Sequence, residues 1–133
     1  MILKYMLDTN IVIYVLKRRP IQVLDIFNQN TNRMAISSIT LSELIYGAEK
    51  SQNISKNLDA IEDFISHIEV LSYDQKTSQT YGQIKAKLEK NGEIIGENDI
   101  HIAAHAISQG LILVTNNLYE FRRVPHLSLE NWV

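Results

Sequence analysis

The sequence contains no cysteine, only two prolines and five glycines, and no long apolar run. Without cysteine, a disulfide framework, a thiolate zinc site, an iron–sulfur cluster and a cysteine nucleophile are all excluded. Any catalysis must therefore use oxygen and nitrogen groups. No apolar run approaches the roughly 20 residues that span a bilayer, and the first residues lack the apolar core of a secretion signal. We expect a cytoplasmic protein that makes no membrane contact.

The length and composition are typical of one globular domain, with 133 residues, of which 45% are hydrophobic and 21% charged. We therefore expect a single domain over residues 1–133. The formal net charge of −2 argues neither for nor against a nucleic-acid partner. Local basic clusters stand at residues 17–19, 85–90 and 122–123. A solvated helix surface is the simpler explanation for any one of them.

Apolar runs and helical periodicities follow one another along the chain. Strands are predicted at 3–7, 34–37, 68–73 and 111–114, and their continuous apolar character is typical of a parallel sheet covered on both faces. Helices are predicted at 11–17, 20–28, 40–50, 54–67, 75–90 and 99–109, with Thr40 and Glu43 as a capping box. This order predicts an α/β fold of three layers, a central parallel β-sheet flanked by helices.

Ligands of such sheets bind beyond the carboxyl ends of the strands, and acidic residues are predicted there. Asp8 follows the first strand, while Glu43 and Asp99 each lie in the first turn of a helix. Taken singly, each acid is explained by helix capping or by the helix dipole. In a parallel sheet, however, all three positions share one edge. Without a cation the carboxylates would repel, whereas Mg²⁺ or Mn²⁺ suits a site built from oxygen ligands.

Four segments, residues 6–10, 41–48, 95–106 and 113–124, resemble in order and spacing the successive motifs of PIN-domain ribonucleases. More narrowly, the whole chain resembles the VapC toxins of bacterial toxin–antitoxin pairs. The resemblance implies a single PIN domain, a PIN-like fold, and a metal-dependent endoribonuclease that uses Mg²⁺ or Mn²⁺. In such an enzyme a metal-activated water attacks the phosphodiester and leaves 5′-phosphate ends.

The resemblance also implies roles for individual residues. The family's first Asp, its Glu and its central Asp match Asp8, Glu43 and Asp99, which we expect to bind the metal and act in catalysis. Many PIN domains have a further Asp where this chain has Asn117, and we expect Glu120 to supply the missing charge as a catalytic residue. The residues expected to fix the carboxylates or to contact RNA are Thr9, Asn10, Thr115, Asn117, Arg122 and Arg123.

The resemblance implies partners as well. These are a VapB-type antitoxin that covers the acidic site, operator DNA bound only through that antitoxin, and a second toxin copy in a homodimer or larger hetero-oligomer. The expected substrate is a structured RNA. A transfer RNA is favoured, with the anticodon loop of initiator tRNA as the specific expectation.

Several alternatives remain open at this point. A receiver-like phosphoacceptor domain also places an Asp at a strand end, but it needs a further acidic pair and a lysine that are missing here. A PIN-like module that acts only by binding an antitoxin or RNA is compatible with Asn117. His101 and His105 stand four residues apart but lack the glutamate of a zinc-protease motif, so structural or surface roles are expected for both. Trp132 is expected to pack onto the domain rather than to stack on a base.

Overall fold

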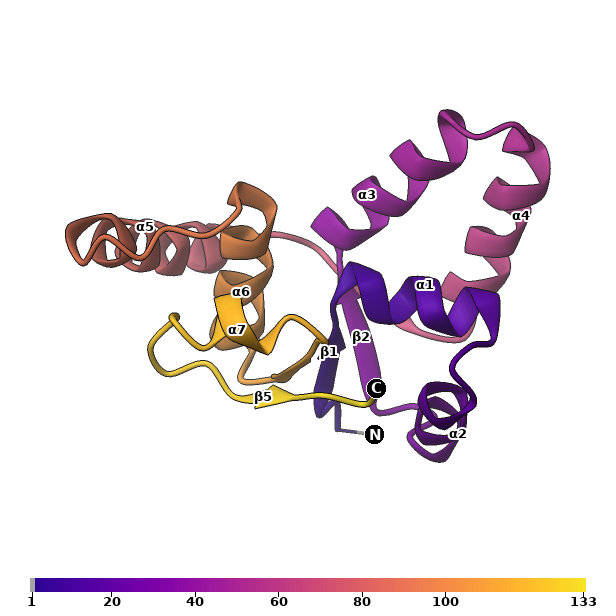
Figure 1. The fold of residues 1–133 in the computed structure, drawn as a ribbon, viewed down its shortest axis with the longest axis horizontal. Helices are drawn as coiled ribbons and strands as arrows, with labels where there is room; N and C mark the ends of the chain where they lie inside the picture. Colours follow the sequence, from indigo (N-terminus) through magenta and orange to yellow (C-terminus); the bar gives the residue numbers. More distant parts are fainter. Residues whose placement is uncertain (1) are drawn as a thin grey trace.

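Five short strands run parallel through the centre of the molecule in the computed structural model, which describes residues 2–133 (Figure 1). The sheet order is β3-β2-β1-β4-β5, and every neighbouring pair is parallel. The α/β fold class with a central parallel sheet is thereby confirmed. The strands are β1 Tyr5–Leu7, β2 Met34–Ser37, β3 Glu69–Leu71, β4 Ile112–Val114 and β5 Leu129–Glu130.

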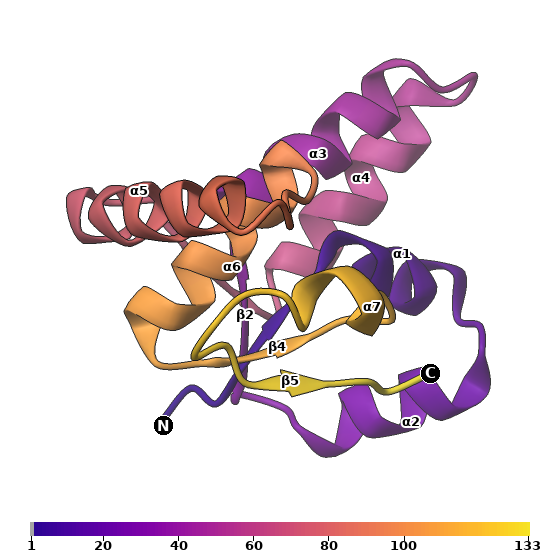
Figure 2. The same cartoon turned by 60° about the vertical axis from the view of Figure 1, so that its left-hand side comes forward.

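Helices cover both faces of this sheet. Because successive side chains of a strand point to opposite faces, Tyr5 and Leu7 pack with α1–α4 and Met6 packs with α5–α7. Figures 1 and 2 show the two groups of helices on either side of β1 and β2. The helices are α1 Thr9–Lys17, α2 Ile21–Gln29, α3 Ser38–Glu49, α4 Ile54–Ile65, α5 Gln75–Lys90, α6 Glu97–Gln109 and α7 Leu118–Phe121. Among residues 2–133, no helix has the length and apolar character needed to cross a membrane.

Local sequence signals account for most helix ends. Asp74 caps α5 by accepting a hydrogen bond from the Thr77 N–H at 2.9 Å, as predicted. Gly110 ends α6 in the left-handed conformation with φ of 68°, which a glycine adopts without steric cost. The predicted start of α6 at Asp99 is two residues late, because Gly96 is the N-cap and Glu97 is already helical.

The strand order decides where a site can form. The chain runs from β1 to β2 to β3 on one side and then crosses to place β4 on the other side of β1. Ligand sites of open parallel sheets lie at such a reversal, outside the carboxyl ends of the two strands. Asp8 directly follows β1 and Thr115 directly follows β4, so both stand at this reversal.

Candidate active site

Polar residues surround Asp8 at the carboxyl ends of β1 and β4. This edge of the sheet, with Asp8, Glu43, Asp99 and Glu120, is called the acidic edge. The backbone N–H of Asp8 continues the sheet by donating to the Val114 carbonyl at 2.9 Å. Its side chain caps α1, with Oδ1 accepting from the Thr9 N–H at 2.8 Å and Oδ2 accepting from the Thr115 hydroxyl at 2.9 Å. The residue is only 4% exposed, and this burial raises the pKa of its carboxyl against the lowering effect of both hydrogen bonds. Asp8 is therefore a rigidly placed carboxylate with a strong demand for positive charge.

Glu43 reaches the same edge from α3. Its Oε1 accepts a hydrogen bond from the Thr9 hydroxyl at 2.7 Å, so Thr9 touches Asp8 through its backbone and Glu43 through its side chain. The predicted capping box of Thr40 and Glu43 is wrong. Helix α3 begins at Ser38, with the Ser37 hydroxyl accepting from the Ile39 N–H at 3.1 Å. Because Ser37 supplies the cap, Glu43 lies in the second turn rather than the first, and its carboxylate is free to face Thr9.

Asp99 is the most strongly perturbed acid of the group. It lies in the first turn of α6, and its pKa is raised to about 7. Burial is the largest cause, followed by the negative charges of Asp8, Glu120 and Glu43. Asp8, Glu43 and Glu120, which come from three other segments, thus act together on Asp99 at this edge. A divalent cation would remove both the repulsion and the cost of burial.

Asn117 and Glu120 extend the network along α7. The Asn117 N–H donates to the Thr115 hydroxyl oxygen at 3.0 Å, and its side-chain amide donates to Glu120 Oε2 at 3.0 Å. Glu120 in turn raises the pKa of Asp99 through its charge and a shared hydrogen bond. Asn117 therefore acts as a neutral bridge that directs the Glu120 carboxylate toward Asp99.

The donor set fits a hard divalent ion in its chemistry. All four acids offer oxygen, cysteine is absent from the chain, and hydroxyl or amide donors orient three of the carboxylates. Within residues 2–133, no three His, Asp or Glu side chains lie close enough together to hold a metal ion.

Other predicted residues lie outside this network. Asn10 is exposed and makes no side-chain hydrogen bond within residues 2–133. Arg122 and Arg123 lie beside the Tyr119 ring, not among the acids. Trp132 is buried and packs edge-on against Tyr5 at 5.1 Å between ring centroids, as expected.

The two histidines have separate structural partners. His101 Nδ1 contacts the Tyr73 hydroxyl at 2.7 Å, and the His101 ring stacks on Tyr81. His105 is fully buried, and its Nδ1 contacts the Ser37 hydroxyl at 2.7 Å. Sequence reasoning missed this link of Ser37 to α6. The sequence did contain a signal for it. Ser37 is a polar residue at the carboxyl end of β2, as Asp8 is beyond β1, and such residues lie at the edge of the sheet where the site forms.

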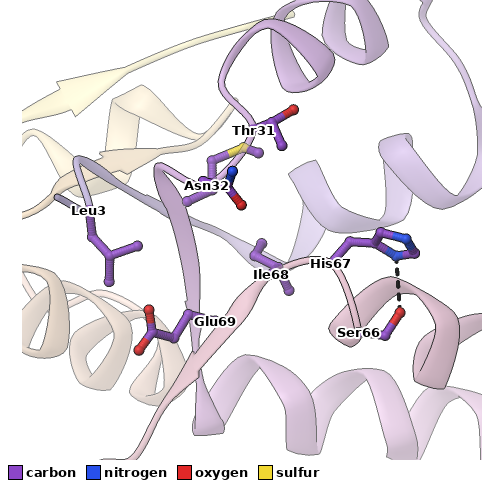
Figure 3. Close-up of a pocket in the computed structure, with 8 residues that line it drawn as sticks. Leu3, Thr31, Asn32, Ser66, His67, Ile68 and Glu69 are labelled. Atoms are coloured by element: carbon purple, nitrogen blue, oxygen red, sulfur yellow. Dashed lines mark hydrogen bonds between the residues drawn. The ribbon is translucent and has the colours of Figure 1, made fainter. Parts of the chain in front are cut away.

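A hollow lies at the opposite edge of the sheet, where β2 and β3 begin (Figure 3). His67 and Glu69 line it, with Leu3, Thr31, Asn32, Met34, Ser66 and Ile68. The His67 ring is already engaged, because Nδ1 lies 3.0 Å from the Ser66 hydroxyl and 2.9 Å from the Asp63 carbonyl. Since only one carboxylate faces this hollow, it does not compete with the acidic edge as a candidate active site.

An apolar groove of about 440 Å³ borders the acidic edge. Residues of α1, α3 and α4 line it, and Thr9 and Glu43 of the acidic site are among them. Its apolar residues include Ile13, Leu16, Leu44, Ala48, Ala60 and Ile61. The acidic site therefore opens beside a surface suited to an apolar segment of another chain.

Known proteins share both the sequence and the fold of this chain. The PIN domain family matches residues 5–127. A ribonuclease VapC2 of Haemophilus influenzae is 62% identical over 131 residues, 98% of this chain and 99% of that protein. A tRNA(fMet)-specific endonuclease VapC of Salmonella typhimurium is 52% identical over 130 residues, 98% of both chains.

Solved structures extend the likeness to the whole fold. The structure of DNA-bound VapBC from Salmonella typhimurium contains a chain that matches with a TM-score of 0.95 at 52% identity, over 98% of this chain and 99% of that chain. VapBC2 from Rickettsia felis, bound to a DNA fragment from its promoter, gives a TM-score of 0.92 at 41% identity over 100% of both chains. The likeness thus includes the strands and helices that place the four acids.

Proposed function

The chain belongs to the PIN-domain family as a VapC ribonuclease toxin, and on that premise we propose that it hydrolyses a transfer RNA at its acidic edge, with residues 1–133 acting as one PIN domain. The observation that carries this proposal is the raised pKa of Asp99, which results from burial and from the nearby charges of Asp8, Glu120 and Glu43. Acids arranged so that they disfavour their own ionisation are characteristic of sites that bind a cation or transfer a proton.

We assign Asp8 and Asp99 as the principal metal ligands, because Asp8 is buried, Asp99 is half-buried and both have raised pKa values. Glu43, oriented by the Thr9 hydroxyl, completes the ligand set or orients the attacking water. Glu120, directed by Asn117, supplies the charge that Asn117 lacks. Thr115 keeps Asp8 in one rotamer by donating to its Oδ2.

We propose Mg²⁺ or Mn²⁺ as the bound ion, because the available ligands are hard oxygens. When bound, such an ion lowers the pKa of a water and offsets negative charge on the attacked phosphate. The chain itself orients the carboxylates through hydrogen bonds from its own donors. Asp8 is held on both oxygens, by the Thr9 N–H and the Thr115 hydroxyl, and Glu43 is held on one oxygen by the Thr9 hydroxyl, so both carboxylates are fixed in direction. A water nucleophile predicts 5′-phosphate and 3′-hydroxyl ends.

The initiator tRNA anticodon loop is the proposed target. Support comes from the relatives named as tRNA(fMet)-specific endonucleases. Physical support comes from accessibility, because the bases of a single-stranded loop can be splayed and the backbone bent toward a recessed metal site. This substrate places the activity in the cytoplasm.

A VapB-type antitoxin is the proposed partner. The apolar groove between α1, α3 and α4 suits an apolar segment of it, and Glu43 among its lining residues suits an arginine that pairs with the carboxylates in charge and geometry. Related toxins have been solved as VapBC complexes with DNA. We propose that this chain reaches operator DNA only through the antitoxin, as a homodimer or larger hetero-oligomer.

Incubation of the purified protein with initiator and elongator tRNA, with Mg²⁺, Mn²⁺ or EDTA, tests the proposal. Discrete cleavage of initiator tRNA is expected, with 5′-phosphate ends. EDTA and the variants Asp8→Asn and Asp99→Asn should each reduce the rate by more than about 100-fold.

Asp74→Asn is the matched control, because Asp74 also caps a helix but lies outside the acidic network. Asparagine caps helices as well as aspartate does, so this variant should fold and cleave normally. Cleavage that persists in EDTA would contradict metal dependence. Products with cyclic phosphate ends would contradict a water nucleophile.

A further inference from the structure

Tyr119 stands exposed beside two arginines on the short helix α7. Its side chain is 65% exposed, whereas Phe121 in the same helix is completely buried. The guanidinium carbon of Arg122 lies 4.9 Å from the centroid of the Tyr119 ring, and that of Arg123 lies 5.2 Å from it. An aromatic ring with two cations at this distance forms a surface that is at once flat, apolar and positively charged.

In the part of the chain that the structure describes, neither arginine of this surface forms an ion pair with an acid. The ion pairs between side chains of residues 2–133 involve Glu97 with Lys85 and His101, and neither Arg122 nor Arg123 takes part in one. Arg123 is nevertheless held in place, because its guanidinium donates to the Ile94 carbonyl at 3.2 Å. The same residues line an open hollow of about 530 Å³ with Gly92 and Glu93. The surface is therefore ordered and available to an anionic ligand.

This surface adjoins the acidic edge along the chain. Tyr119 immediately precedes Glu120, so their Cα atoms are about 3.8 Å apart. Glu120 accepts a hydrogen bond from Asn117, which is joined through Thr115 to Asp8. The Tyr119 ring and the Glu120 carboxylate are therefore carried by the same short helix.

Binding of RNA at the acidic edge requires positive charge on a neighbouring surface. Four carboxylates repel a polyanion until a cation is bound, so attraction for RNA must come from neighbouring groups. Arginine side chains pair with phosphates, and an aromatic ring stacks on a base whatever its identity. Both contacts are present together in these three residues.

We propose that Tyr119, Arg122 and Arg123 bind a nucleotide of the single-stranded RNA next to the cleaved bond, with the base stacked on the tyrosine ring and its phosphates paired with the arginines. This inference rests on the proposed ribonuclease function and names binding residues that the acidic network does not include. Glu93 lines the same hollow, so its charge opposes a bound phosphate and its neutralisation should strengthen binding.

Steady-state kinetics of tRNA cleavage test this inference. Tyr119→Ala should raise KM about ten-fold and leave kcat within about two-fold, whereas Tyr119→Phe should retain the wild-type KM. The double variant Arg122→Gln/Arg123→Gln should raise KM. It should also reduce the slope of log KM against the logarithm of the salt concentration by about 1 to 2. Glu93→Gln should lower KM. The charge-matched control is Arg18→Gln/Arg19→Gln. It removes two exposed arginines just beyond the carboxyl end of α1, whereas Asp8 lies at the amino end, and it should leave KM unchanged.

A second measurement does not depend on cleavage. A single-stranded RNA oligonucleotide carrying 2-aminopurine should lose fluorescence when it stacks on the wild-type protein in EDTA, and Tyr119→Ala should abolish that loss. If the wild type cleaves no tRNA but quenches the probe in a Tyr119-dependent way, the proposed function fails and the nucleotide site stands. An unchanged KM and an unchanged quench in Tyr119→Ala would overturn the site, as would a fall in kcat alone. Equal displacement of the probe by polyglutamate of the same charge would also overturn it, because a peptide cannot stack as a base does.

Discussion

The Thr115 hydroxyl donates a hydrogen bond to Oδ2 of Asp8 at 2.9 Å, although the two residues are 107 positions apart in the chain. The bond joins the ends of the two adjacent strands β1 and β4. Because Asp8 is almost fully buried, this donor also offsets part of the cost of its charge. The relationship shows how the sheet builds the site, since strand pairing brings a carboxylate and its donor together.

Thr115→Val should therefore damage both stability and catalysis. The substitution conserves shape but leaves an Asp8 oxygen without its donor, so we expect a loss of about 1–3 kcal/mol in the free energy of unfolding. The kcat should fall by about 10–100-fold, because the Asp8 carboxylate is no longer oriented. Urea denaturation and tRNA cleavage measure the two effects. Thr115→Ser retains the hydroxyl and should restore most of both, and a Val variant as active as wild type would contradict the role of Thr115.

The stability of the metal-free protein should fall as pH rises through the range in which Asp99 ionises. The folded-state pKa is raised from 3.8 to about 7, so the folded protein binds this proton more tightly than the unfolded chain does. Stability is then greatest below about pH 4 for this group, declines between about pH 4 and 7, and is lowest above pH 7. The raised pKa of Asp8 acts in the same direction.

Thermal unfolding in EDTA at about pH 5.5 and pH 8 checks this, and Tm should be several degrees lower at the higher pH. Saturating Mn²⁺ should raise Tm more at pH 8 than at pH 5.5, because the ion binds the ionised carboxylates. In Asp99→Asn the pH dependence should be smaller. An equally steep dependence in that variant would assign the effect to other groups.

Asn117→Asp should convert a neutral bridge into an additional acid. The Asn117 amide donates to Glu120 at 3.0 Å, and an aspartate would replace this hydrogen bond by repulsion between two carboxylates. We expect the metal-free protein to lose about 1–2 kcal/mol of stability and the apparent affinity for Mn²⁺ to rise several-fold. Calorimetric titration and urea denaturation measure these effects. Asn117→Ala removes the same hydrogen bond without adding charge, so an equal gain in affinity there would refute the electrostatic explanation.

Ser37→Ala should loosen the contact between the helices that carry Glu43 and Asp99. The Ser37 hydroxyl caps α3 through the Ile39 N–H and contacts His105 of α6 at 2.7 Å. Loss of a cap and of a buried hydrogen bond should together cost about 1–3 kcal/mol. Urea denaturation measures the cost. Ser42→Ala is the matched control on the exposed surface of α3, and its effect should stay within about 0.5 kcal/mol; equal effects of the two variants would contradict a special role for Ser37.

Local features were predictable from sequence because local physics decides them. Asp74 caps α5 and Gly110 ends α6 through contacts within a few residues, so their sequence neighbourhood suffices. The start of α3 was misplaced because Ser37 and Thr40 are both suitable caps. Only the position of β2 decides between them, since Ser37 is its last residue.

The short elements near the carboxyl end were not predicted at all. Helix α7 has four residues and β5 has two, too few for a hydrophobic period to be visible. Strand β5 exists because β4 pairs with it, through hydrogen bonds from Leu113 to Ser128 and from Thr115 to Glu130. These bonds are long-range contacts that no local pattern reports.

The sequence by itself determined the types of side chain available and where strands end in polar residues. It excluded thiol chemistry and placed Asp8 and Thr115 at strand ends. Only the tertiary structure decided that the acids at positions 8, 43 and 120 act on Asp99, and that threonine and asparagine side chains hold these three acids. The physical reason is that parallel pairing in the order β3-β2-β1-β4-β5 brings distant segments to one edge, whereas the local forces readable from sequence act over only a few residues.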